Sequence, residues 1–398
     1  MTALITVAGW DGTPLAPHVR DRLDAAELVL AGRRHLREVA LPPHVRTLAL
    51  RDDPLGAVDA VVACEGPVVV LASGDPGFFG IVRLLRARVP AERLEVVPAV
   101  SSVALAFARA GLPWDDAVVV SAHGRDLRPA VAACRAHPKV AVLTDRGAGP
   151  AEIGAALADL PRRLVVAERL GLPDERVVSL APQDAPQQQW AEPNVVLVVD
   201  DARAIAPGKG WLAGRVAPDE WALPESAFAH RDGMVTKSEV RALALARLGP
   251  RLGDVVWDVG AGSGSVGVEC ARLGAAVVAV EKGPVEHLRA NAAAFGVDLQ
   301  VVQGAAPAAL EGLPDPDAVF VGGGGADVAD VVRACVARGP RRVVVALAAL
   351  DRVAPVAEAL APYAVDGVQL SAARLRPLAG AHALAATNPV LVLWGTRP

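Results

Sequence analysis

The sequence predicts an α/β protein whose sheets are mainly parallel and are divided between two domains. Apolar runs rich in β-branched residues alternate with Ala-, Leu- and Arg-rich stretches of helical period along most of the chain. This alternation is typical of strands that are each followed by a helix and that pair in parallel. The length of 398 residues exceeds one ordinary core, so at least two domains are expected.

The first half of the chain shows the alternation from its first apolar run onward. Residues 201–230 contain several Pro and Gly residues and lack a clean period, so we expect them to form a linker between a domain at 1–200 and a domain at 231–398. No internal repeat relates the two halves. The strands predicted in the first half are the runs 4–8, 68–72, 117–121, 140–144, 163–167 and 195–199.

A new cycle of strands and helices begins after the linker. A helix is expected from about Ser238, and the β-rich end of the chain, 365–395, is expected to add an antiparallel hairpin to the sheet edge. Together these elements predict a doubly wound, Rossmann-like sheet. The strands predicted in the second half begin at Val255, Ala276, Leu299, Ala318 and Arg342.

A glycine-rich turn, Asp258–Gly267, lies between the strand at 255–257 and a helical pattern at 266–273. Residues without Cβ allow a tight turn and the close approach of a ligand to a helix N-terminus. Two cofactors fit the spacing. Residues 262–267 match the dinucleotide pattern G-x-G-x-x-G, whereas 258–264 match the pattern of S-adenosylmethionine (SAM) methyltransferases, with an acid at the strand end.

The neighbouring residues favour SAM. Glu281 ends the next strand, where a carboxylate can accept hydrogen bonds from ribose hydroxyls in either kind of site. Asp258, the terminal hairpin and the segment 233–241, which would cap the methionine end of the cofactor, point to SAM specifically. A simpler interpretation of Thr236 in that segment is that it caps the following helix.

The second half resembles the decarboxylating precorrin methyltransferase domain of cobalamin biosynthesis. The resemblance covers nearly all of residues 230–398 and rests on the segments 233–245, 258–267, 317–324 and 388–395. The chain departs from the family at 304–307, where Ala305 replaces an acid expected to bind the adenine amino group, leaving backbone and apolar contact to Ala306. The resemblance implies that SAM is bound by Thr236, Gly260, Ala261, Gly262, Ser263, Gly264, Ala306 and, at the ribose, Glu281.

The first half contains turn motifs that, taken singly, are more often ordinary turns or helix caps than sites. Gly-Asp-Pro-Gly at 74–77 follows one predicted strand, and Ser101 and Ser102 lie at a strand-to-helix junction. Together with the motifs at 32–35, 111–115, 121–125, 143–145 and 168–171, they resemble the two-lobed tetrapyrrole methylase fold, nearest to its precorrin C5 branch. The resemblance covers roughly residues 1–200.

This second resemblance implies a further SAM site, in a cleft between two lobes. The residues that it assigns to the cofactor are Gly74, Asp75, Ser101 and Ser102. The chain departs from the family's first motif, a Gly-x-Gly turn, which reads Gly9-Trp-Asp-Gly12 here and includes Trp10.

Jointly, the two resemblances imply SAM-dependent methylation of a precorrin at C5 and C15 with loss of carbon dioxide from a ring acetate. Methyl transfer requires alignment and exclusion of water rather than a side-chain nucleophile. Candidates for handling protons and charge are His123, Arg125 and Lys237. Because the substrate carries several carboxylates, guanidinium groups are also expected near the sites. Further basic candidates are Arg33, Arg34, Arg241, Arg374 and Arg376.

Composition excludes several classes of protein. A net charge of −4 argues against a nucleic-acid-binding protein, and no apolar run approaches the length of a bilayer span. The four cysteines lack metal-ligand spacing, so no metal is expected. We expect a cytoplasmic homo-oligomer. Alternatives that remain open are a nicotinamide-dependent oxidoreductase, a SAM methyltransferase acting on another substrate, and a second domain that only senses SAM.

Overall fold

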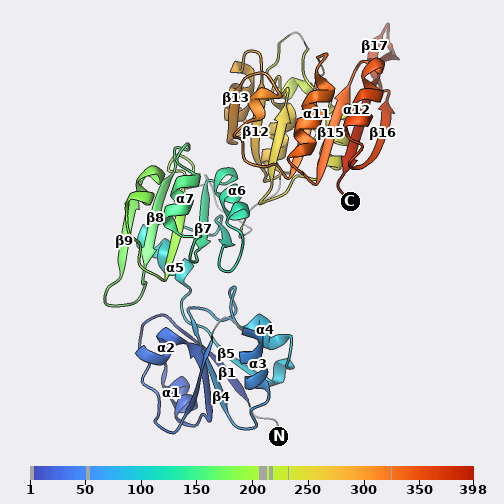
Figure 1. Ribbon diagram of the computed structural model, residues 1–398. Coiled ribbons are helices and arrows are strands. Elements are labelled where there is room, and N and C mark those ends of the chain that lie inside the picture. The colour runs from blue at the N-terminus through green and yellow to red at the C-terminus, as the bar shows by residue number, and fades with distance from the viewer. Residues whose placement is uncertain (1–3, 51–53, 206–212, 215–217, 232, 324) are drawn as a thin grey trace. The chain divides into compact units, whose positions relative to one another are not determined.

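The computed structural model describes residues 4–50, 54–205, 213–214, 218–231, 233–323 and 325–398 (Figure 1). The chain divides into two compact units. Unit 1 comprises residues 1–125 and 139–211, and unit 2 comprises residues 126–138 and 212–398. Each unit is described by itself. In the described part of the chain, no helix is long and apolar enough to cross a bilayer.

Unit 1 contains two five-stranded sheets, of which the first is entirely parallel. Its elements are β1 (Ile5–Trp10), α1 (Pro17–Asp24), β2 (Leu28–Gly32), α2 (Arg33–Glu38), β3 (Arg46–Leu50), α3 (Pro54–Val62), β4 (Val68–Ser73), α4 (Val82–Arg86), η1 (Ala91–Arg93) and β5 (Leu94–Val97). The strand order is β3-β2-β4-β1-β5. Helices α1 and α2 pack on one face of the sheet, and α3 and α4 pack on the other. The loops that follow β1, β4 and β5 therefore meet at one edge.

The second sheet of unit 1 is mixed, with strand order β6-β7-β10-β8-β9. Its elements are α5 (Ser102–Ala110), β6 (Val118–Ser121), β7 (Lys139–Leu143), α7 (Pro150–Ala156), β8 (Arg163–Glu168), β9 (Arg176–Leu180), η2 (Pro182–Gln187) and β10 (Asn194–Val199). Only β6 and β7 pair in parallel among these strands. Helix α5 packs on the sheet through Val103, Ala106 and Phe107. The helix between β6 and β7, α6 (Arg128–Ala136), falls in the segment grouped with unit 2.

Unit 2 contains a seven-stranded sheet of order β13-β12-β11-β14-β15-β19-β16. Its elements are η3 (Glu225–Ala227), α8 (Ser238–Leu248), β11 (Val255–Val259), α9 (Ser265–Arg272), β12 (Ala276–Glu281), α10 (Glu286–Ala294), β13 (Leu299–Gln303), η4 (Ala308–Leu310), β14 (Ala318–Gly322), α11 (Val328–Ala337), β15 (Arg342–Leu347), η5 (Leu350–Arg352), α12 (Val353–Ala359), β16 (Ala364–Leu370) and β19 (Val390–Thr396). Strands β11 to β15 are parallel, and β16 and β19 are antiparallel. Helices α11 and α12 cover one face and α8 and α9 the other, giving three layers.

The terminal segment confirms the predicted antiparallel addition and extends it. Strands β19 and β16 are added to one edge of the sheet. Between them in the sequence, β17 (Ala373–Leu378) and β18 (Ala381–Ala386) form a separate two-stranded ribbon. The leucines of this ribbon are exposed: Leu375 by 73% and Leu384 by 67%. The ribbon lies outside the hydrophobic core of unit 2.

Every predicted strand is present, whereas β2, β3, β5 and β9 were missed. The missed strands are four or five residues long, and β3, β5 and β9 lie at sheet edges, where one side is exposed and the apolar pattern is weaker. The α/β class with a doubly wound sheet in the second half is confirmed. Residues 222–229, which fall in the predicted linker, form hydrogen bonds with α9 and α10 of unit 2.

Candidate functional site

A cavity of about 1020 Å³ lies at the carboxyl ends of the central strands of unit 2. The loops after β11, β12, β13 and β14 contribute to its wall, because parallel strands end at one edge of the sheet. The segment that precedes α8 contributes as well. The predicted cofactor and catalytic residues that line the cavity are Thr236, Lys237, Gly260, Ala261, Gly262, Ser263, Glu281 and Ala306.

Three positions of the loop are occupied by glycine for different structural reasons. Gly260 has a φ of +72°, and a Cβ there would lie 2.2 Å from the carbonyl oxygen of Gly322. Gly262 has a φ of +55° with open space beside it, so it leaves room for a ligand. Gly264 is the N-cap of α9, and a Cβ there would lie 2.8 Å from Leu288. Gly264 thus packs against α10 and is not among the residues that line the cavity.

Two acids hold the loop in place. The buried carboxylate of Asp258 accepts a hydrogen bond from the backbone N–H of Gly267 (2.8 Å), which fixes the start of α9. Its other oxygen, Oδ1, is buried without a partner in the described residues. Burial raises the pKa of Asp258 to about 7, despite the hydrogen bond from Gly267.

Glu281 lies at the end of β12, where the cavity wall turns. Its Oε2 accepts from the backbone N–H of Gly262 (2.8 Å), and its Oε1 accepts from the backbone N–H of Gly283 (2.7 Å). Each carboxylate oxygen can accept a second hydrogen bond. Glu281 therefore orders the loop and keeps acceptor capacity toward the cavity.

A buried ion pair anchors the segment that leads into α8. Arg241 is fully buried, and its Nε lies 2.8 Å from Oε1 of Glu269. Arg241 also donates to the carbonyl oxygens of Thr236 (2.5 Å) and Leu223, while Glu269 accepts from the backbone N–H groups of Ala222 (2.6 Å) and Leu223 (2.9 Å). Arg241 is therefore a positioning residue, and the expectation that it binds a substrate carboxylate is wrong.

The same segment is fastened a second time by Asn291 of α10. The Asn291 amide donates to the carbonyl oxygens of Ala229 and Ser263 (2.8 Å each) and accepts from the backbone N–H of Ala229 (2.7 Å). One buried side chain thus joins the leading segment to the glycine-rich loop. Neither Asn291 nor Glu269 was singled out from the sequence, because a polar residue inside a helix gives no periodic signal.

Thr236 does not cap α8. The N-cap is Lys237, whose own side chain forms no capping hydrogen bond, and Oε1 of Glu225 instead accepts from the backbone N–H of Ser238 (2.8 Å). Thr236 instead lines the cavity, with its carbonyl held by Arg241. The half-buried Lys237 side chain also faces the cavity and forms no ion pair with a carboxylate that the structure describes.

Arg374 is not available to a substrate carboxylate either. It forms ion pairs with Glu225 and Glu239 (2.7 Å each), which ties the base of the β17–β18 ribbon to the start of α8. The hydrogen bonds from Arg374 lower the pKa of Glu225 to about 2. Arg376, two residues along the same strand, is exposed.

In unit 1, the predicted Gly-Asp-Pro turn and the serine junction lie side by side. A Cβ at Gly74, which has a φ of +60°, would lie 3.1 Å from Cα of Ser101 and 3.3 Å from N of Ser102. Gly9 is equally close-packed, since a Cβ there would lie 1.9 Å from the carbonyl oxygen of Gly74. The turn after β4 and the junction after β5 thus lie against the end of β1, and these close backbone contacts are possible because Gly9 and Gly74 have no side chain.

The polar side chains of this convergence mainly order their own loops. Ser101 caps α5 by accepting from the backbone N–H of Ala104 (3.1 Å), and Oδ1 of Asp75 accepts from Gly77 (2.8 Å). Ser102 is the first residue of α5. The simpler interpretation of Ser101 as a helix cap is confirmed, and a cap leaves the second lone pair of its oxygen free.

The loop after β1 reaches the second sheet of unit 1. A Cβ at Gly12 would lie 2.1 Å from the carbonyl oxygen of Gly171, and one at Gly171 would lie 1.7 Å from that of Asp11. Both glycines have positive φ, so the two backbones touch only because neither residue has a side chain. Trp10 ends β1 and donates to the carbonyl oxygen of Thr13 (2.8 Å).

His123 and Arg125 lie in the exposed loop after β6. The His123 ring nitrogen Nδ1 is 3.4 Å from Oδ2 of Asp145, in the loop after the neighbouring strand β7. Burial opposes ionisation of Asp145, but hydrogen bonds from the backbone of Arg146 and Gly124, with His123 nearby, hold its pKa below the usual value. Arg125 donates to Ser121 (2.9 Å). No hydrogen bond between described residues joins this pair to the Gly74 and Ser101 loops.

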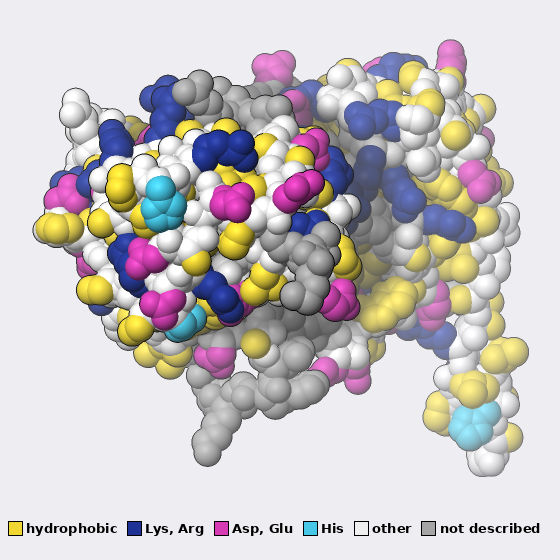
Figure 2. Space-filling model, turned by 90° about the horizontal axis from the view of Figure 1, so that it is seen from below, with side chains coloured by type: hydrophobic (Ala, Val, Ile, Leu, Met, Phe, Trp, Pro, Cys, Tyr) yellow, Lys and Arg dark blue, Asp and Glu magenta, His cyan; other side chains and the backbone are white. Residues whose placement is uncertain are grey.

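No group of three or more His, Cys, Asp or Glu residues in the described ranges could hold a metal ion. Positive and negative side chains are interspersed on the face that Figure 2 draws. This distribution agrees with the small net charge.

Two family models match the chain. A model described as the precorrin methyltransferase domain matches residues 226–397, and one described as tetrapyrrole (corrin/porphyrin) methylases matches residues 12–183. Together they span both halves.

Named relatives match across most of the chain. A precorrin-6Y C(5,15)-methyltransferase (decarboxylating) of Sinorhizobium sp is 38% identical over 343 residues, which cover 80% of this chain and 78% of the relative. One from Mycobacterium tuberculosis (strain CDC 1551 / Oshkosh) is 35% identical, covering 81% and 80%. The solved C-terminal domain of the Rhodobacter capsulatus protein is 36% identical and covers 44% of this chain and 97% of that one, with a TM-score of 0.40. The chain therefore belongs to the family of decarboxylating precorrin-6Y C(5,15)-methyltransferases.

Proposed function

We propose that the chain uses SAM to methylate a precorrin at C5 and C15 and removes carbon dioxide from a ring acetate, converting precorrin-6B to precorrin-8. Residues 1–200 would carry out the C5 methylation, and residues 231–398 the C15 methylation and decarboxylation, with 201–230 between them. The observation that carries the proposal is the unit 2 cavity, lined at once by Gly260–Ser263, Glu281 and the segment before α8. Membership of a methyltransferase family favours SAM over a nicotinamide cofactor at this loop.

The residues present fit SAM at the unit 2 cavity. Glu281 has acceptor capacity for ribose hydroxyls, and Gly262 leaves open space beside it. Thr236, Ala261, Ser263 and Ala306 would supply the remaining wall. When bound, SAM supplies an electrophilic methyl group.

The contribution of the chain to methyl transfer is alignment and exclusion of water. Its packed loops fix where a ring carbon can approach, and no protein nucleophile is needed. In the decarboxylation, the electrons of the broken carbon–carbon bond enter the conjugated ring system and end on a proton. Carbon dioxide leaves as a neutral molecule, and Lys237, a cation in the cavity wall, is placed to stabilise the negative charge that enters the ring until the new methyl carbon takes up the proton.

At unit 1, we propose that Gly74, Asp75, Ser101 and Ser102 bind the second SAM molecule. The convergence of the glycine turns and the remaining acceptor capacity of Ser101 support this. His123 and Arg125 would contact substrate carboxylates from the exposed loop after β6. Replacing either by Ala is expected to weaken C5 methylation while C15 methylation survives; equal loss of both would reject the role.

We further propose that the protein assembles into a homo-oligomer through the β17–β18 ribbon. The leucines of the ribbon are exposed to water, and burying them against a second copy would remove apolar area from water and so favour association. Light scattering of the protein and of a Leu375→Ser, Leu384→Ser variant would test this. The variant is expected to form a smaller species.

The product mass tests the activity directly. The purified chain is incubated with SAM and precorrin-6B, and the product is weighed by mass spectrometry. The expected product gains two methyl groups and loses carbon dioxide. A product with a methyl gain but no loss of carbon dioxide would contradict the activity proposed for unit 2, and an unchanged substrate would contradict both.

The ribose role of Glu281 is tested by titration. Glu281→Ala is expected to raise the dissociation constant of one of two SAM sites by about tenfold or more, because charge-assisted hydrogen bonds are lost. Glu311→Ala, an exposed glutamate of the same unit, serves as the control. Unchanged binding in the Glu281 variant would reject the role.

A further inference from the structure

Four side chains of unit 1 that the proposed SAM site does not use form a cluster at the carboxyl edge of the first sheet. Trp10 ends β1, Ser73 ends β4 opposite it, and Arg34 and His35 open α2 directly after β2. Since β4 lies between β1 and β2, the three strand ends bring these residues together. We name them the Arg34 cluster.

His35 forms the buried floor of the cluster. It is 5% exposed, its ring packs edge-on against Trp10 at 5.5 Å, and its Nε2 lies 3.2 Å from Oγ of Ser73. Burial, assisted by the charge of Arg34, lowers the pKa of His35 to about 4, so the ring is neutral at pH 7.

The proton of the neutral ring belongs on Nε2. The other nitrogen, Nδ1, is buried with no partner in the described residues, and a buried N–H without an acceptor is rarer than a buried lone pair. With the proton on Nε2, His35 donates to Ser73. The hydroxyl proton of Ser73 is then not used by His35.

Arg34 donates from the other side. Its NH2 group lies 3.1 Å from Oγ of Ser73, and its guanidinium stacks over Trp10 at 5.8 Å. Ser73 thus accepts two hydrogen bonds, and its own O–H is left to point out of the cluster, where the residue is exposed.

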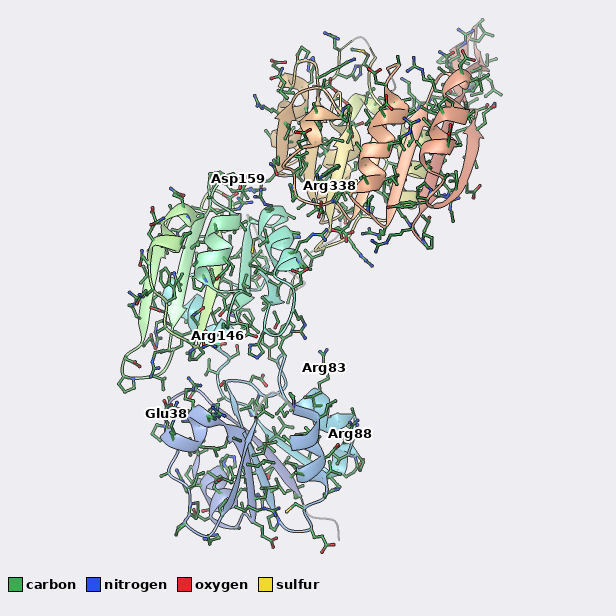
Figure 3. The ribbon with its side chains drawn as sticks, in the orientation of Figure 1. Glu38, Arg83, Arg88, Arg146, Asp159 and Arg338 are labelled. Atoms are coloured by element: carbon green, nitrogen blue, oxygen red, sulfur yellow. The ribbon has the colours of Figure 1, made fainter. Side chains whose placement is uncertain are left out.

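The charge of Arg34 is not balanced by a close anion. It forms no ion pair with a carboxylate in the part of the chain that the structure describes. Glu38, which Figure 3 labels on the same helix, acts on it only through space. Partial burial lowers the pKa of Arg34 from its usual value. A half-buried guanidinium beside a hydroxyl that points toward solvent offers two kinds of hydrogen-bond donor and a positive charge to an anion.

We propose that Arg34 and Ser73 form a carboxylate-binding subsite for the methyl transfer of unit 1, with His35 and Trp10 positioning them. The inference rests on the function proposed above. Ser73 directly precedes Gly74, so the subsite is continuous with the proposed cofactor loop. The carboxylate belongs either to an acetate or propionate chain of the tetrapyrrole or to the methionine end of SAM, because both present the same planar anion.

Steady-state kinetics of the full chain tests the subsite. Arg34→Gln is compared with Arg37→Gln, which removes the same charge from an exposed position of the same helix. The C5 methylation rate is measured by mass spectrometry against precorrin concentration and, separately, against SAM concentration. Arg34→Gln is expected to raise one KM by about tenfold with a smaller change in kcat, and Arg34→Lys to restore part of it.

The two sources of the carboxylate give different results. A raised KM for the precorrin assigns the subsite to the substrate, and a raised KM for SAM assigns it to the cofactor; either supports the subsite. If both KM values of Arg34→Gln match those of Arg37→Gln, or if kcat alone falls, the subsite is overturned.

Two further measurements keep the test decisive. Ser73→Ala, a small change at an exposed position, is expected to raise the same KM by a few-fold even if Arg34→Gln folds poorly. The C15 product with loss of carbon dioxide should persist in every variant, which shows that unit 2 is folded, and a retained kcat of C5 methylation shows the same for unit 1. If wild-type protein forms neither product, the proposed function fails rather than the subsite.

Discussion

The two units use acidic and basic groups at their strand edges in opposite ways. In unit 2, the acids Asp258 and Glu281 are tied to backbone N–H groups of the loops, and the buried Arg241–Glu269 pair fixes the segment before α8. In unit 1, close glycine contacts bring the loops together, and a neutral buried histidine supports an unpaired arginine. Unit 2 thus fixes its loops through acids and a buried ion pair, whereas in unit 1 close glycine contacts add to local hydrogen bonds such as that of Asp75, and Arg34 forms no ion pair with a described carboxylate.

The strongest test of this contrast breaks the buried pair of unit 2. Glu269→Gln leaves the Arg241 charge uncompensated and is expected to cost unit 2 about 3–5 kcal/mol of unfolding free energy. Denaturant unfolding measures the loss, with the exposed Glu311→Gln as control. Under conditions where unit 2 of the Glu269→Gln variant remains folded, the rate of C5 methylation by unit 1 should equal that of the wild-type chain.

A double variant separates stability from positioning. Arg241→Met with Glu269→Met is expected to recover part of the stability, because no buried charge remains. The affinity of unit 2 for SAM should stay low, since the backbone of Thr236 and Leu223 is no longer held. Full recovery of affinity would show that the pair does not position the segment.

Asp258 should make unit 2 less stable as pH rises. The pKa of Asp258 is about 7 in the folded chain and 3.8 in the unfolded chain, so between these pH values the folded state binds more protons. The contribution of Asp258 to the unfolding free energy is therefore largest below pH 4. It falls as the pH rises to 7, by about 4 kcal/mol at most. Asp258→Asn should remove that slope in unfolding measured from pH 5 to 8. A variant that keeps the wild-type slope would contradict the assignment.

His35 should act with the opposite sign in unit 1. Its pKa is about 4 when folded against 6.5 when unfolded, so the unfolded state binds more protons in that window. The contribution of His35 is fully present above pH 6.5 and is lost as pH falls toward 4, by about 3 kcal/mol. In His35→Gln, unfolding of unit 1 should lose this dependence. His44→Gln, in the exposed turn before β3, is the control.

The smallest expected effect concerns the departure at Ala305, which lines the unit 2 cavity. Ala305→Asp would offer an acceptor to the adenine amino group, and we expect SAM affinity at unit 2 to rise by a few-fold. Isothermal titration measures this. A weaker site would show that the present cavity accommodates the adenine without an acid.

Much of the fold could be predicted because parallel strands covered on both faces carry continuous apolar runs. The starts of β11 to β15 were predicted at the correct residues for this reason. Short edge strands such as β3 and β9 gave no comparable signal. The glycine turns were also readable, since their positive φ values exclude most other residues.

The candidate sites divide in the same way. The parallel strands of unit 2, the glycine-rich loop and the position of Glu281 at a strand end could be predicted from local sequence, because these follow from local backbone requirements and strand ends. Which arginines pair with carboxylates depends on how the elements pack. Arg241 and Arg374 are occupied by Glu269, Glu225 and Glu239, residues 28 to 149 positions away in the chain. Pairing over such separations depends on how the elements pack, and no local pattern of residues encodes it.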